Sequence, residues 1–195
     1  MTSSSSSLER GLDTMILVYS LLQGHPAAAT CEQFLRSQSG WFTSPLVLAE
    51  ARNVLTKVYA ISAGAATAKL LQFAAAPVVL LDLDQATITA SFPLADTHGL
   101  DITDAVLLHQ ARSHGARELV TEDQRLTQAC RQLGLTAVSP IDVALRQQVS
   151  VWEAVNLPSK GLPRILRRVY HWLNQSHVQA AQDFWSQTAS GSHLP

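Results

Sequence analysis

The sequence predicts a three-layer α/β/α sandwich with a central parallel sheet and a C-terminal helical extension. Short apolar segments recur along the first three quarters of the chain, helical apolar patterns separate them, and glycine or proline ends several of those helices. Strands that alternate with helices favour right-handed crossovers onto one parallel sheet. With 195 residues, of which 47% are hydrophobic, the chain can form one domain of ordinary size plus an extension.

Five segments are expected to form the strands of this sheet. The run 77–83 (PVVLLDL) is the most continuously apolar, and we expect it to be the clearest buried strand. The first segment, in contrast, carries few β-branched residues. In chain order the five segments are 8–13, 41–43, 77–83, 117–121 and 135–138.

Helices are expected between the strands. Ser44 followed by Pro45 is typical of a helix start, with serine as the N-cap and proline at the first helical position, and this helix should reach about Ala60. A later helix, 85–96, should be interrupted by Pro93. The other expected helices are 16–23, 27–37, 65–75, 101–114 and 125–133.

Four acidic residues occupy positions that this fold would bring together. Asp13 and Asp123 directly follow the first and fourth expected strands, whereas Glu50 and Asp104 lie among the inward-facing apolar positions of their helices. In an open α/β sheet, ligands bind outside the carboxyl ends of the strands. Four carboxylates without matching basic residues would repel one another there, so a divalent cation is the natural compensation. Oxygen ligands suit Mg²⁺ or Mn²⁺.

A metal in such a site favours hydrolysis of phosphodiester bonds, because it activates water and stabilises charge on a phosphoryl group. A simpler interpretation exists for two of the acids. Asp123 could merely favour a helix start, where Thr121 and Gln124 have capping-box spacing, and Asp101 could be a cap rather than a support for the metal site.

Four short motifs resemble those of the PIN-domain ribonucleases, most closely their VapC-type toxin branch. Residues 13–15 (Asp-Thr-Met) resemble the Asp-Thr-Asn-like motif that ends the first strand in that family, and residues 44–50 resemble its Ser-Pro-x-x-x-x-Glu helix. Residues 104–105 (Asp-Ala) and 121–123 (Thr-Glu-Asp) resemble its Asp-Ala helix start and its Thr-x-Asp motif after a strand. The resemblance covers about residues 8–145.

This resemblance implies a Mg²⁺- or Mn²⁺-dependent endoribonuclease that hydrolyses RNA phosphodiester bonds and acts as the toxin of a toxin–antitoxin pair. Its expected partners are RNA, an antitoxin protein and a second copy of the chain in a homodimer. The residues expected to bind the metal and carry the catalysis are Asp13, Glu50, Asp104 and Asp123. The residues expected to support them are Asp101, Thr14 and Thr121.

Two departures from the family pattern leave alternatives open. Met15 stands where the family often has asparagine, which removes a polar group near the expected metal, and the chain continues well beyond the resemblance. A catalytically weakened PIN-like module that binds RNA or protein is therefore one alternative. A phosphatase that uses the same metal chemistry is another.

Composition divides the chain into three expected parts. Residues 1–7 form a disordered Ser-rich tail, 8–145 the PIN-like domain, and 146–195 a helical, basic extension. Residues 1–145 contain nine Lys and Arg against thirteen Asp and Glu, whereas the last fifty contain five against two. In the extension, Arg164, Arg167 and Arg168 share one expected helix face and are candidates for RNA contacts, although a solvated face explains them equally simply.

The chain shows no targeting or membrane pattern. Residues 16–22 are apolar but lack a preceding basic region, and no segment approaches the roughly 20 apolar residues that span a membrane. A cytoplasmic protein is expected. Cys31 and Cys130 lack metal-ligand spacing, so we expect them to be buried free thiols.

Overall fold

The computed structural model describes residues 8–157 and 164–189. Within the second range it does not describe the side chains of Arg164, Ile165, Arg167, Arg168, His171 and Ala189. The expected tail, 1–7, lies outside the described residues. The chain divides into two compact units, Met1–Arg146 and Gln147–Pro195. Whether they correspond to the expected functional parts stays a prediction.

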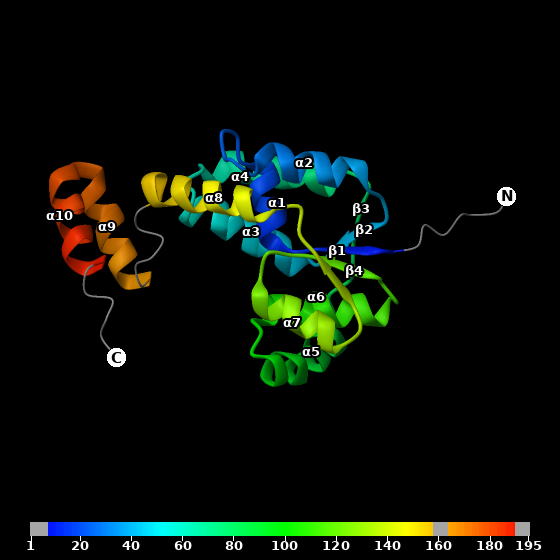
Figure 1. Cartoon of the computed structure of the whole chain (residues 1–195). Helices are drawn as coiled ribbons and strands as arrows, with labels where there is room; N and C mark the ends of the chain where they lie inside the picture. The colour runs from blue at the N-terminus through cyan, green and yellow to red at the C-terminus, as the bar shows by residue number, and fades with distance from the viewer. Residues whose placement is uncertain (1–7, 158–163, 190–195) are drawn as a thin grey trace. The chain divides into compact units, whose positions relative to one another are not determined.

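The first unit is built around a five-stranded sheet in which every neighbouring pair of strands is parallel. The strand order is β3-β2-β1-β4-β5, so the first strand lies at the centre (Figure 1). This arrangement confirms the predicted fold class. The strands are β1 (Arg10–Leu12), β2 (Trp41–Thr43), β3 (Val78–Leu80), β4 (Glu118–Val120) and β5 (Thr136–Val138).

Helices cover both faces of this sheet. Helices α1 to α4 pack against one another on one face, and α5 to α7 form the layer on the other face (Figure 1). The first group is α1 (Thr14–Leu21), α2 (Ala28–Ser37), α3 (Pro45–Lys57) and α4 (Ala63–Ala74). The second group is α5 (Gln85–His98), α6 (Ile102–Ser113) and α7 (Gln124–Gln132).

The centre of the sheet is closely packed at β1. A Cβ atom added at Gly11 would lie 2.2 Å from Leu119 Cδ2 and 2.9 Å from Phe42 Cζ, so any larger residue would have to displace these two side chains. Both of these neighbours are fully buried. Because interiors are packed at crystal-like density, this close approach fixes the position of β1, and with it the residue that follows β1.

The prediction for residues 77–83 was wrong about burial. Strand β3 contains only Val78–Leu80 and lies at the edge of the sheet, where Val79 is 42% and Leu80 is 37% exposed. A continuous apolar run indicates a strand, but it does not distinguish a central strand from an edge strand, because the strand order depends on tertiary pairing.

Three helix predictions also need correction. Helix α5 continues through the exposed Pro93 to His98 and ends at Gly99, whose φ of 62° gives a left-handed cap. Proline removes one hydrogen bond there without stopping the helix. Helix α3 ends at Lys57, before Ala60, whose φ is 54°. The extension was predicted to be helical from residue 146, but its first helix, α8 (Val143–Asn156), begins earlier, where Asp142 Oδ1 accepts a hydrogen bond from Leu145 N, 2.7 Å away.

The second unit contains the greater part of α8 and a pair of helices that pack against each other, α9 (Arg164–Ser176) and α10 (Val178–Ala189). Their small core is formed by Tyr170 and Ala181, which are buried. The partly buried apolar residues around it are Leu166, Leu173, Phe184 and Trp185. Among the described residues, no helix is both long enough and apolar enough to cross a membrane.

Candidate active site

The candidate site lies where the strand order reverses. From β1 the chain proceeds outward through β2 and β3, and then returns to place β4 and β5 on the other side of β1. Asp13 follows β1, and Asp123 follows β4, the strand directly beside it. The Asp13 amide donates to the Val120 carbonyl across this junction, 3.1 Å away. Crevices at such switch points are the usual ligand sites of open α/β sheets.

Asp13 is held firmly in place at this junction. It is 4% exposed and caps the N-terminus of α1, where its Oδ1 accepts a hydrogen bond from Thr14 N. Its Oδ2 accepts from Thr121 Oγ1 at 2.7 Å. Burial raises the pKa of Asp13 from 3.8 to about 6, although the hydrogen bonds from Thr121 and Thr14 oppose that rise. The negative charges of Glu50 and Asp123 raise the pKa further.

Glu50 reaches the site from α3. Ser44 caps this helix by accepting a hydrogen bond from Leu46 N, and Pro45 occupies the first turn, as the sequence predicted. The half-buried Glu50 side chain accepts a hydrogen bond from Thr14 Oγ1 at 2.7 Å. Thr14 therefore connects the carboxylates of two elements, because its amide binds Asp13 and its hydroxyl binds Glu50.

Asp104 lies in the first turn of α6 and is half-buried. Burial raises its pKa from 3.8 to about 8, and the next largest causes are the charges of Asp13, Asp123, Glu50 and Asp101, in that order. The structure thus brings all four predicted acids within electrostatic range of one another. Their mutual repulsion favours proton or cation binding, as carboxylates that share one site generally do.

Asp123 is exposed and has a structural function as well. Its Oδ1 caps α7 by accepting a hydrogen bond from Leu126 N at 2.8 Å, and its amide donates to Thr121 Oγ1 at 2.9 Å. Asp123 therefore favours a helix start, as the simpler interpretation predicted, but it is itself the N-cap, in place of a capping box that begins at Thr121, and only its Oδ1 accepts the capping hydrogen bond. Asp101 is the N-cap residue of α6, as the capping interpretation predicted, although its side chain makes no capping hydrogen bond.

The chemistry of the site fits a hard divalent cation, because every charged group that meets there is a carboxylate. In the described part of the chain, however, no three Asp, Glu, His or Cys side chains converge closely enough to enclose a metal ion directly. The two observations are compatible, since Mg²⁺ usually binds one or two carboxylates and retains several waters.

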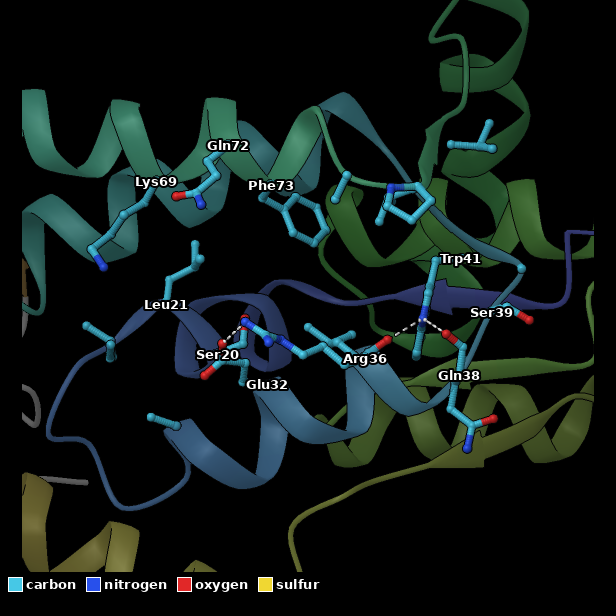
Figure 2. A pocket seen from close by; sticks show the side chains of 18 of the residues that line it. Ser20, Leu21, Glu32, Arg36, Gln38, Ser39, Trp41, Lys69, Gln72 and Phe73 are labelled. Carbon is cyan, nitrogen blue, oxygen red and sulfur yellow. Dashed lines mark hydrogen bonds and ion pairs between the residues drawn. The ribbon is translucent and has the colours of Figure 1, made fainter.

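A separate cavity of about 820 Å³ lies at the opposite edge of the sheet. Trp41 and Val78, which begin β2 and β3, line it together with residues of α1, α2 and α4. Figure 2 shows Lys69 and Phe73 of α4 pointing across this cavity toward α2. Sequence reasoning missed it because its lining comes from many separate elements, and no local pattern marks it.

Comparison with known proteins identifies the family. The family model described as PIN domain matches residues 12–132, which is more than half of the chain. The chain belongs to the PIN-domain family. This match confirms the resemblance seen in the sequence. No curated protein matches the chain in sequence.

Solved structures agree on the fold of this PIN-domain chain. The VapC20 protein of Mycobacterium tuberculosis, described as a toxin that cleaves the sarcin-ricin loop, superposes with a TM-score of 0.56 at 18% identity, covering 62% of this chain and 95% of VapC20. PAE2754 from Pyrobaculum aerophilum superposes with a TM-score of 0.52 at 20% identity, covering 76% and 97% of the two chains. At these identities the similarity shows the fold alone.

PIN domains are in general nucleases that use divalent metal ions, so the family supports a nuclease-type function for this chain.

Proposed function

We propose that this chain is a metal-dependent endoribonuclease that hydrolyses RNA phosphodiester bonds with Mg²⁺ or Mn²⁺. In this proposal Asp13, Glu50, Asp104 and Asp123 hold the metal, one or two of them by direct contact and the others through its bound waters. The observation that supports it is the gathering of acids around the half-buried carboxyl of Asp104, because the neighbouring charges that act on it are all negative. A site that gathers uncompensated carboxylates at a switch point is suited to a divalent cation.

The cation, when bound, would activate a water molecule and stabilise the charge on the phosphoryl group. The residues of the chain then have distinct roles. Thr14 and Thr121 hold Asp13 in one orientation, and Thr14 also holds Glu50. Asp104 is the acid whose charge the surroundings destabilise most, so its carboxylate gains most from a nearby cation.

Asp101 lies beside this set and contributes negative charge to Asp104. We propose that it supports the site electrostatically and does not bind the metal directly, because its side chain is exposed at the start of α6.

The proposal extends to a biological setting. VapC20, which shares the fold, is described as a toxin that cleaves the sarcin-ricin loop. On this ground we propose that the chain acts on RNA as the toxin of a toxin–antitoxin pair, that an antitoxin protein is its partner, and that it forms a homodimer.

The test is cleavage of a structured RNA by the purified full chain, with Mn²⁺, with Mg²⁺ and with a chelator. Asp104→Asn should reduce metal-dependent cleavage by about a hundredfold or more, because it replaces a negatively charged group at the metal with a neutral amide. Asp96→Asn is the matched control, since Asp96 is an exposed acid on the neighbouring helix α5. Full activity in Asp104→Asn would contradict the assignment.

Met15 supports one alternative, a module that binds RNA or protein without cleavage. Its half-buried side chain follows Thr14 at the start of α1, beside the proposed metal site. The basic helix α9 would then be the binding surface, although the side chains of Arg164, Arg167 and Arg168 lie outside the described residues. Absence of divalent-cation binding, together with RNA binding that depends on residues 146–195, would favour this alternative.

A second alternative is a phosphatase with the same metal chemistry. The choice of substrate distinguishes it from the proposed ribonuclease. The proposal expects cleavage of RNA and no turnover of a generic phosphomonoester. Turnover of the phosphomonoester alone would support the phosphatase.

A further inference from the structure

A polar groove adjoins the acidic site at the β5 edge of the sheet. It has a volume of about 540 Å³ and is bounded by α7, by β5 and by the first turn of α8. Ala137 and Val138 are the apolar residues of its lining, and the remaining lining residues are polar or charged. Thr121 belongs to the groove and also donates to Asp13 Oδ2, so the groove begins at the residue that holds the central acid.

One face of α7 forms a wall of this groove. Gln124, Thr127, Gln128 and Arg131 recur at spacings of three and four residues and therefore lie on the same side of the helix. The opposite side buries Leu126, Ala129 and Cys130 in the core. A polar helix face is ordinarily only solvated, but here it faces a second wall across a concave space.

The charges in the groove are unequal. Glu122 is neutralised by Arg146, whose Nε and Nη2 atoms each donate to it at 3.0 Å, and it also accepts a hydrogen bond from Ser139. Arg131 lines the same groove, yet its guanidinium makes no ion pair or hydrogen bond with any residue that the structure describes. The groove therefore carries a net positive charge beside a strongly acidic centre.

This difference in charge has a consequence for an RNA substrate. The four acids repel phosphates wherever a bound cation does not shield them, so an RNA strand needs a favourable contact close to the site. Arg131 offers that contact, because a guanidinium can bind a phosphate through two parallel hydrogen bonds. Gln124 and Gln128 each present both a donor and an acceptor that can pair with a base edge.

We propose that the groove along α7 binds the single-stranded RNA segment next to the cleaved bond, with Arg131 on a backbone phosphate and Gln124 and Gln128 on a base. The inference rests on the proposed ribonuclease function and names the place where its substrate is held. Residues 124 and 131 are about 10 Å apart along the helix axis, so the groove extends beyond a single phosphate. Unpaired bases are accessible to such side chains, whereas bases within an RNA helix are not.

The first test measures binding of a fluorescent single-stranded RNA to the full chain in chelator, so that no metal-dependent cleavage occurs. Arg131→Ala should weaken binding roughly fivefold at low salt and reduce the slope of log affinity against log salt by about 0.7, the loss of one phosphate contact. Arg112→Ala is the matched control. Arg112 is an exposed arginine in the last turn of α6, as Arg131 is in the last turn of α7, but it lies outside the groove.

The binding experiment tests the RNA groove, and a cleavage experiment tests the ribonuclease function. Weaker binding and a smaller salt slope in Arg131→Ala alone support the groove, whereas no change, or an equal change in Arg112→Ala, overturns it. Cleavage by the wild-type chain in Mn²⁺ is measured separately. Absence of that cleavage, with Arg131-dependent binding intact, overturns the ribonuclease function and leaves the RNA groove standing.

The second test concerns base recognition. Gln128→Ala should change the relative affinity for oligonucleotides of the four bases by at least about fivefold while leaving the salt slope unchanged. Gln132→Ala is the control, because Gln132 is exposed on α7 but does not line the groove. Unchanged base preference in both Gln128→Ala and Gln124→Ala would overturn the assignment of these amides to a base.

Discussion

The two edges of the same sheet differ in what their side chains do. At the amino ends of the strands, Trp41 is 4% exposed, and its Nε1 donates to the carbonyls of Leu35 and Gln38 beside an apolar cavity. At the carboxyl ends, Asp13 is equally buried, yet desolvation and neighbouring acids destabilise its charge. One edge therefore stabilises the fold, and the other retains an electrostatic strain that a ligand can relieve.

This difference shows how a small α/β domain can separate stability from function. Residues at the amino edge gain free energy from burial and from satisfied hydrogen bonds. Residues at the carboxyl edge are held by hydrogen bonds that fix their positions while leaving their charges unbalanced. Mutations at the amino edge should consequently reduce stability more than activity, and mutations at the carboxyl edge should reduce activity more than stability.

The largest predicted effect is a loss of stability caused by a mutation at the amino edge. Trp41→Ala should lower the free energy of unfolding by about 3–5 kcal/mol, because it leaves a large cavity at a nearly fully buried position. Chemical denaturation measures this loss. At a temperature where the variant remains folded, its metal-dependent kcat should equal that of the wild type. A large loss of kcat in the folded variant would break the separation of the two edges.

The next largest predicted effect is a loss of activity caused by a mutation of Thr121. Thr121→Val keeps the side-chain volume but removes the hydroxyl that donates to Asp13 and accepts from Asp123 N. Activity should fall by about 10- to 100-fold, the usual result when a residue that orients a metal ligand is lost. Steady-state RNA cleavage measures it.

Thr43→Val provides the matched control for Thr121. Thr43 is also a buried threonine at the carboxyl end of a strand, but its hydroxyl donates to the Leu12 carbonyl rather than to an acid. Its loss should reduce stability by about 1–3 kcal/mol and leave activity within a small factor. Equal losses of activity in the two variants would show that Thr121 has no special role.

A smaller effect is expected in the pH dependence of stability without metal. The folded chain holds the pKa of Asp13 at about 6 and that of Asp104 at about 8, above the ordinary 3.8, so it binds more protons than the unfolded chain between roughly pH 4 and 8. Stability from these groups is greatest below pH 4 and declines as the pH rises through 6 and 8.

The corresponding measurement is the Tm in chelator at pH 5 and pH 8. The Tm should fall by a few degrees between these pH values, Asp104→Asn should reduce the fall, and excess Mn²⁺ at pH 8 should reverse it. A Tm that rises from pH 5 to pH 8 to the same extent in wild type and Asp104→Asn would contradict the electrostatic strain.

Local signals explain why much of the fold could be predicted. Ser44 and Pro45 mark the start of α3 within their own few residues, and the short apolar segments mark all five strands. The gathering of the acids also followed from the sequence, because the carboxyl ends of parallel strands share one edge. The thiols of Cys31 and Cys130 are buried and free, as predicted, and burial raises their pKa values to about 12 and about 11.

Features that depend on long-range pairing could not be predicted in the same way. The hydrogen bond from Thr121 to Asp13 joins residues 108 positions apart and exists because β4 lies beside β1. The edge position of β3 depends on the same strand order, which no residue of β3 encodes alone. Likewise, the groove along α7 requires the start of α8, a helix whose local signal is the cap at Asp142.

The most direct test of the central claim is a crystal of the chain soaked in Mn²⁺ and measured for anomalous scattering. The account predicts a peak at the carboxyl edge of β1 and β4, in direct contact with at least one oxygen of Asp13 or Asp104 at about 2.0–2.3 Å and completed by waters. A site without a peak at saturating Mn²⁺, or a peak bound only elsewhere on the chain, would contradict it.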